Sequence, residues 1–154
     1  MDTNVKTSYL KDEYLLLQKF YEDYDSRVVT IKGWSATIGL AAIGGGIYQS
    51  SYLWLFASVV SLICWILESI WKSFQSMFGS RISLIEKAFR DDDFSAISPL
   101  QIYTSWFDTL KERGFHIFYF FKSGIVVFPH AAIVLVGIVL FILNETGLIK
   151  LAQK

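Results

Sequence analysis

The chain has 154 residues, of which 53% are apolar, 17% aromatic and 18% charged, and its mean hydropathy is +0.42. This composition favours a membrane protein over a water-soluble domain. Fourteen Lys and Arg balance fourteen Asp and Glu, which argues against a generic nucleic-acid-binding protein and against an acidic disordered tail. The single cysteine, Cys64, excludes an intramolecular disulfide and a zinc site built on paired cysteines.

Two long stretches of the chain carry no formal charge. One has 35 residues between Lys32 and Glu68, and the other has 22 residues between Lys122 and Glu145. Both exceed the roughly 18 residues that indicate a membrane-spanning helix. The first stretch is long enough for two spans and is interrupted at residues 49–51, which predicts a helical hairpin. The expected spans are 28–48, 52–71 and 124–143.

The helices are expected to continue beyond the spans. Apolar and tyrosine side chains alternate at spacings of four and three, which predicts one helix over residues 8–48; they are Leu10, Tyr14, Leu17, Tyr21, Tyr24, Val28 and Ile31. This seam is typical of a core face, and it also suits contact with another subunit. An apolar stripe likewise extends the second helix over 52–90.

A short helix is expected next, because Ser98-Pro99 has the form of an N-cap followed by proline at the first helical position. No alternating strand pattern occurs. The predicted fold is an all-α membrane protein with three transmembrane helices and cytoplasmic helical extensions. It forms a single domain over 1–154, with segments 8–48, 52–90, 98–113, 117–144 and a tail at 145–154.

The distribution of Lys and Arg predicts the orientation, because positive residues resist export across the membrane. Five lie in residues 1–32, none in the hairpin loop, seven in residues 72–123 and two after residue 143. This alternation places the N-terminus and residues 72–123 in the cytoplasm and the tail 145–154 outside. The charged first 30 residues do not resemble a removable signal peptide.

Small residues recur at helical spacing in the first span, where they allow close approach of another helix. The candidates for a pore-lining or packing face are Ser35, Thr37, Gly39, Ala41 and Gly45. Packing against the second span of the same chain explains this pattern equally well. Bulky residues near the hairpin, Tyr48 and Trp54, are candidates for a gate.

Two ionisable groups lie within or beside the predicted spans. His130 is expected as a neutral histidine bonded to a neighbouring helix, with proton sensing or gate sensing as the alternative. Glu68 has Lys72 four residues later, and the two are expected to form a structural ion pair.

Basic residues on the cytoplasmic side are candidates for binding an anionic ligand, because a ring of subunits would multiply their charge. They are Lys72, Arg81, Lys87, Arg90, Lys111 and Arg113. Ordinary positive-inside topology and solvated helix faces explain the same residues. Catalytic and metal-binding motifs are absent from the sequence, so neither an enzyme nor a metal or other cofactor is expected.

A charged helix enters a Gly-rich spanning hairpin and continues into the amphipathic segment WKSFQSMFGSRISLIEKAF. Over residues 8–90 this order of parts resembles the SLATT-type membrane effectors of bacterial antiphage systems; the third span is additional to their two-span plan. It is also similar to the membrane effector of Hailong systems, a channel-forming oligomer controlled by single-stranded DNA oligomers from a partner nucleotidyltransferase. The resemblance implies an oligomer that breaches the inner membrane in response to a nucleotide signal.

These observations lead to two functional hypotheses. The first is a homo-oligomeric channel or pore in the bacterial inner membrane, gated from the cytoplasm by an anionic nucleotide or oligonucleotide in antiphage defence by abortive infection. The second is a non-conducting membrane anchor or regulatory subunit that docks a soluble cytoplasmic partner.

Overall fold

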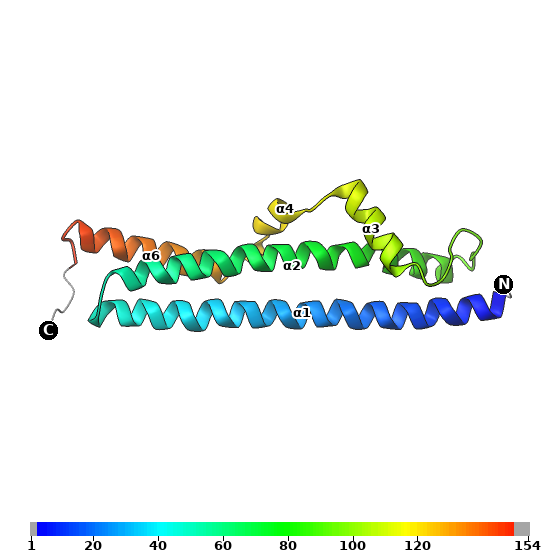
Figure 1. Cartoon of the computed structure of the whole chain (residues 1–154), viewed down its shortest axis with the longest axis horizontal. Helices are drawn as coiled ribbons and strands as arrows, with labels where there is room; N and C mark the ends of the chain where they lie inside the picture. Colours follow the sequence, from blue (N-terminus) through cyan, green and yellow to red (C-terminus); the bar gives the residue numbers. More distant parts are fainter. Residues whose placement is uncertain (1–2, 150–154) are drawn as a thin grey trace. The chain divides into compact units, whose positions relative to one another are not determined.

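The computed structural model describes residues 3–149, and every regular element in that range is an α-helix (Figure 1). Two long helices, α1 (Thr3–Tyr48) and α2 (Tyr52–Arg90), are joined by a three-residue connection. Four shorter helices follow: α3 (Ile102–Arg113), α4 (Ile117–Phe121), α5 (Gly124–Val127) and α6 (His130–Glu145). The predicted all-α class is confirmed.

The chain divides into two compact units, and both long helices contribute to each of them. The described parts of 1–27 and 71–116 form one unit, called here the α3 unit. The described parts of 28–70 and 117–154 form the other, called the α6 unit.

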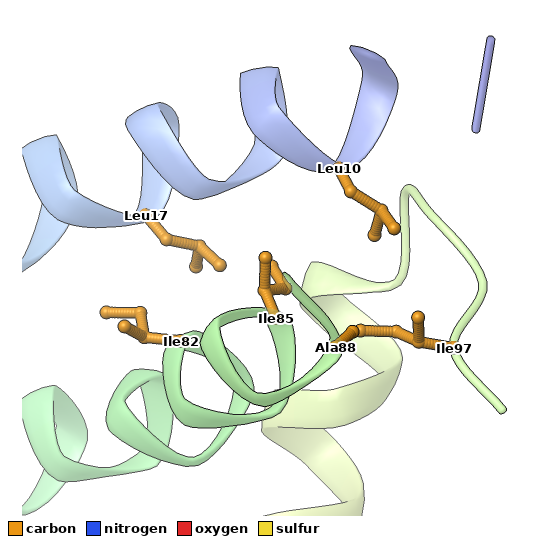
Figure 2. Packing of buried hydrophobic residues seen from close by; sticks show 6 residues of the cluster. All are labelled: Leu10, Leu17, Ile82, Ile85, Ala88 and Ile97. Carbon is orange, nitrogen blue, oxygen red and sulfur yellow. The ribbon is translucent and has the colours of Figure 1, made fainter. Parts of the chain in front are cut away.

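The core of the α3 unit is the apolar seam of α1 packed on the apolar stripe of α2. Its buried residues are Leu10, Leu17, Ile82, Ile85, Ala88 and Ile97 (Figure 2). In Figure 2 Leu17 of α1 points toward Ile82 and Ile85 of α2. Tyr14 and Tyr21 pack against the same cluster. The seam is therefore a core face. Burial of each Leu or Ile in it stabilises the fold by about 1.5–3 kcal/mol.

The helix expected from Pro99 begins instead at Ile102. A buried carboxylate explains the difference. Glu13 Oε2 accepts a hydrogen bond from the Leu100 backbone N–H at 2.7 Å, and Leu100 has a φ of 63°, which is incompatible with a right-handed helix. The segment before α3 is therefore held by α1 and is not available as the first helical turn.

In the α6 unit, α6 packs closely against both long helices. A Cβ added at Gly39 of α1 would lie 2.7 Å from the Ile133 side chain. One added at Gly137 would lie 2.3 Å from Ser58 Oγ and 2.5 Å from the Trp54 carbonyl oxygen of α2. Ser58 Oγ also donates to the Val134 carbonyl at 3.1 Å. Glycine at these positions lets the helix backbones approach each other.

The continuous third span expected over 124–143 is not present as one helix. Phe128 is extended, with φ −91° and ψ 134°, and Pro129 follows it before α6 begins. Proline has no backbone N–H and excludes the helical conformation from the preceding residue, which explains the break. The 16 residues of α6 extend for about 24 Å, less than the roughly 30 Å of a bilayer core. Residues 150–154 of the expected external tail lie outside the described range.

Two helices, α1 and α2, are long and apolar enough to cross a membrane, and a third such helix is not found among residues 3–149. Only 28% and 39% of their most apolar windows are buried within the chain. Most residues of these windows are therefore not buried by the chain itself, as expected for helices in contact with lipid.

Candidate functional site: a buried cluster of polar side chains

Five polar side chains from three helices meet inside the α6 unit. Lys32 and Ser35 are one turn apart on α1, Ser61 and Glu68 are two turns apart on α2, and His130 is the first residue of α6. Helical spacing places each pair on one face of its helix. Ser35, Ser61, Glu68 and His130 are all 0% exposed, and the Lys32 side chain is 25% exposed, so four of the five side chains form a buried polar network.

His130 connects α6 to both long helices. Its Nε2 lies 2.9 Å from Glu68 Oε2, and its Nδ1 lies 2.8 Å from Ser35 Oγ. The expectation that His130 bonds to a neighbouring helix is therefore confirmed. Buried polar groups require such partners, because each one left without a hydrogen bond costs about 1–3 kcal/mol.

The two serines extend the network back to α6. Ser35 Oγ and Ser61 Oγ are 2.7 Å apart, and Ser61 Oγ donates to the His130 carbonyl at 3.1 Å. His130 is thus held at its ring and at its backbone by a closed chain of hydrogen bonds.

Lys32 supplies the positive charge of the cluster. Its Nζ lies 3.3 Å from Glu68 Oε1 and donates to the carbonyls of Ile125 and Phe128, the latter at 3.2 Å. These carbonyls precede the break at Pro129, where the helix no longer supplies N–H partners. The contact with Glu68 is ionic in geometry, because Oε1 accepts no hydrogen bond from the described residues.

The order of Glu68, His130 and Ser35 is that of the acid, base and nucleophile in a hydrolase. Complete burial prevents a substrate from reaching Ser35 Oγ in this conformation. Chemically, the arrangement instead suits binding of a proton among groups that lie within hydrogen-bond distance of each other.

The predicted small-residue face divides between the inside and the outside of the α6 unit. Ser35 and Gly39 are buried within the chain, whereas Thr37 and Ala41 are exposed. Gly45 is half-buried, and a Cβ there would lie 3.3 Å from the Leu53 side chain. Of the predicted set, only Thr37 and Ala41 are exposed.

The three gate candidates occupy different environments. Tyr48 is exposed at the end of α1. Trp54 is buried, and its Nε1 donates to the Ile43 carbonyl at 2.9 Å, so it fastens α2 to α1. His130 belongs to the polar cluster.

The expected ion pair between Glu68 and Lys72 does not form. Glu68 bonds to His130 and lies beside Lys32, while Lys72 Nζ lies 2.6 Å from Asp25 Oδ1 in the α3 unit. Partial burial alone would raise the pKa of Asp25, but hydrogen bonds from Lys72 and Gln75 and the charge of Lys72 outweigh it and hold that pKa below its usual value.

Arg81 is the most buried of the basic candidates, with 5% of its surface exposed. Its Nε and Nη2 donate to the two oxygens of Glu13 at 2.8 and 3.1 Å, and its Nη2 also donates to the Ser98 carbonyl at 2.6 Å. The pair is buried, so its role in the α3 unit is structural.

The other basic candidates are more exposed. Arg90 pairs with Asp91 at 3.2 Å, and Lys111 Nζ lies 4.5 Å from the centre of the Phe107 ring. Lys87 and Arg113 line a groove of about 1080 Å³ in the α3 unit, together with Arg81.

This groove lies between the last turns of α2 and helix α3. Its acidic lining residues are Asp91, Asp93, Asp108 and Glu112, and hydroxyl side chains line much of the rest. A hydrogen bond from Ser95 lowers the pKa of Asp93. The structure therefore brings three of the six basic candidates together, but in a groove of mixed charge.

Three members of these sites were not singled out from the sequence for their observed roles: Lys32 and Ser61 in the cluster, and Glu13 beside Arg81. The available signal was weak. Ser61 and Glu68 are seven residues apart, which places them on one face of α2, but serine is common in apolar helices.

Comparison of the chain with family models, with curated proteins and with solved structures finds no match.

Proposed function

We propose that the protein is a homo-oligomeric channel or pore of the bacterial inner membrane. The observation that carries this proposal is the exposed small-residue face of α1, on which Gly33, Thr37 and Ala41 follow each other at intervals of four within an apolar helix. Small residues are favourable where helices approach closely in lipid. Within residues 3–149, all three residues of this face are exposed. It suits contact between subunits or the lining of a narrow pore.

Control from the cytoplasm is the second part of this proposal. Helices α1 and α2 each contribute residues to the α3 unit and to the α6 unit. A ligand that binds the α3 unit would therefore act on helices that also form the α6 unit. With the N-terminus in the cytoplasm, the α3 unit is the cytoplasmic part.

The mixed groove of the α3 unit suits an anionic nucleotide or oligonucleotide. Lys87 and Arg113 would contact phosphates, while Asp108 and Glu112 would accept hydrogen bonds from sugar hydroxyls or base amino groups. In this proposal, which also draws on the resemblance to SLATT-type and Hailong effectors, the channel acts in antiphage defence and a nucleotidyltransferase is the source of the signal.

Planar-bilayer recording of the purified protein tests the proposal directly. We expect discrete conductance steps from the wild-type chain, and their loss when Ala41 is replaced by Leu, because the larger side chain prevents close approach. Val59→Leu, at an exposed position of α2, is the matched control and should conduct normally. Absence of conductance from folded wild-type protein, with and without nucleotides, would refute the channel.

One observation favours a second candidate, a membrane anchor for a soluble partner. Tyr103 and Phe107 of α3 are exposed and stacked, with ring centres 6.0 Å apart, and Leu100, three residues before Tyr103, is also exposed. Exposed aromatic clusters are typical of protein interfaces. Purification of a stoichiometric soluble partner that is lost in Tyr103→Ser, from cells that tolerate overexpression, would support the anchor over the channel.

A further inference from the structure

Helix α4 is short, aromatic and exposed. Four of its five residues, in the sequence IFYFF, have aromatic side chains, and none of the five is buried. Phe118 is 82% exposed and Tyr119 is 69% exposed. Contact of neighbouring apolar rings with water is unfavourable, so this surface favours a covering that the rest of residues 3–149 does not provide.

Two contacts hold the end of α4 against the apolar part of α2. The rings of Phe121 and Trp65 are stacked, with centres 4.2 Å apart and planes 6° from parallel. Trp65 Nε1 also donates to the Phe121 carbonyl at 3.0 Å. Trp65 belongs to the uncharged stretch that ends before Glu68. Helix α4 is therefore fixed beside the helix that is most suited to cross a membrane.

The level of α4 along the α6 unit follows from Lys32 and Glu68. These two residues border the uncharged stretch of the long helices, and Lys32 Nζ lies 3.3 Å from Glu68 Oε1. Trp65 lies about one helical turn from Glu68, on the apolar side. Lys32 also donates to the carbonyls of Ile125 and Phe128, which follow α4 in the chain. Helix α4 is therefore placed where the apolar part of the α6 unit ends.

We propose that α4 is an interfacial segment whose aromatic side chains insert into the headgroup region of the lipid bilayer. Aromatic side chains favour this zone, because the ring is apolar and the hydroxyl of a tyrosine such as Tyr119 reaches water. Lys122 directly follows α4 and is exposed, and among residues 3–149 it forms no ion pair, so its ammonium reaches a lipid phosphate. The proposal rests on the membrane location that the channel and the anchor share, and it does not require conduction.

A lipid surface explains these features better than a second copy of the chain. Ile125 and Phe128 are 73% and 70% exposed, so apolar exposure continues from α4 into the segment before α6. The most apolar window of α2 is only 39% buried, which extends the exposed apolar surface onto the helix that holds α4. A cation, Lys122, borders this surface. Apolar surface that continues onto a span and ends at a basic residue is typical of a bilayer interface.

Depth measurement by electron paramagnetic resonance tests the proposal. A spin label is attached in Phe118→Cys, in a chain that also carries Cys64→Ser because Cys64 is the one native cysteine. Power saturation with oxygen and a water-soluble nickel complex gives the depth of the label. In nanodiscs of phosphatidylglycerol, we expect the label to lie within about 5–10 Å of the boundary between headgroups and acyl chains. Labels in Val59→Cys and Glu22→Cys, at exposed positions of α2 and α1, should lie deeper in lipid and in water, respectively.

The two reference labels separate the possible failures. A label at residue 118 that is as accessible to nickel as the label at residue 22 would overturn the proposal by placing α4 in water. A label protected from both reagents would overturn it in favour of a protein contact. If the label at residue 59 is also in water, the membrane location proposed above fails; if that label is deep in lipid, only the interfacial segment is refuted.

The charge of Lys122 gives a second test in the same labelled chain. Lys122→Glu places a carboxylate beside the lipid phosphates, so the label at residue 118 should shift toward water. The ratio of inserted to water-exposed label should fall on the order of fivefold, the value of one basic residue beside an anionic surface. Lys111→Glu on α3 is the matched control and should leave the depth unchanged. An unchanged depth in Lys122→Glu would contradict the contact with lipid phosphate.

Discussion

Gly137→Ala tests whether α6 packs against α2 as closely as the structure shows. The added Cβ would meet Ser58 Oγ at 2.3 Å and the Trp54 carbonyl oxygen at 2.5 Å, about 1 Å short of an ordinary contact. Ser58 can rotate, but the carbonyl belongs to the α2 backbone, so the two helices must separate. Separation also stretches the hydrogen bond from Ser58 to the Val134 carbonyl.

The magnitude follows from these contacts. Overpacking costs about 1–3 kcal/mol and the weakened hydrogen bond about 1 kcal/mol. The helical preference of alanine over glycine returns about 0.5–1 kcal/mol. The free energy of unfolding should therefore fall by about 1–3.5 kcal/mol.

Equilibrium unfolding of the purified protein in mixed detergent micelles measures this change. Gly79→Ala in α2 is the matched control, because its Cβ would have nothing within 4 Å and the residue lies outside the small-residue face of α1. It should increase the free energy of unfolding by about 0.5–1 kcal/mol through helix preference alone. Equal effects of the two substitutions would refute the close packing of α6 on α2.

Three further predictions concern the α3 unit. Leu17→Ala should lower the free energy of unfolding by about 2–5 kcal/mol, because Leu17 is fully buried; a loss below 1 kcal/mol in denaturant titrations would contradict its place in the core. Arg81→Met should cost about 3–5 kcal/mol by leaving Glu13 buried without its partner, and Glu13→Leu in the same chain should restore most of the stability. The contact with Lys72 stabilises the fold above the usual Asp25 pKa of about 3.8, and this contribution is lost as the pH falls through the lower folded pKa. In Lys72→Gln, the Asp25 pKa measured by carboxyl NMR should rise; an unchanged pKa would contradict the assigned cause.

Local patterns were sufficient to predict the two long helices. The spacing of Leu10 and Leu17 identified a face that the structure buries against α2. The three-residue break at 49–51 separates α1 from α2, and three aspartates follow Arg90 at the end of α2. Periodicity and helix breakers act within a few residues, so a single sequence contains them.

In the third apolar segment, the helix-breaking effect of a proline overrides the prediction from the length of the uncharged stretch. The 22 uncharged residues before Glu145 favour a continuous span, but Pro129 divides them into α5 and α6. The proline was visible in the sequence. The sequence pattern could not show which side chain would bond to the carbonyls freed by the break. In the structure it is Lys32 of α1, which donates to the carbonyls of Ile125 and Phe128.

The buried cluster depends on contacts between helices, which spacing alone does not specify. Because side chains four residues apart on a helix are neighbours, the sequence predicted an ion pair between Glu68 and Lys72. In the structure the choice is made by tertiary packing, which gives Glu68 the His130 ring and gives Lys72 the Asp25 carboxylate. His130 was identifiable as a polar residue in an apolar segment, but its partners required the arrangement of three helices.

Membrane potential in cells that express the chain from an inducible promoter tests the central claim most directly. We predict rapid depolarisation by the wild-type chain and its loss in Ala41→Leu, with Val59→Leu remaining active and all three chains present in the membrane fraction. A membrane potential that stays unchanged in cells with abundant wild-type protein, with and without infection, would contradict the channel and favour the anchor.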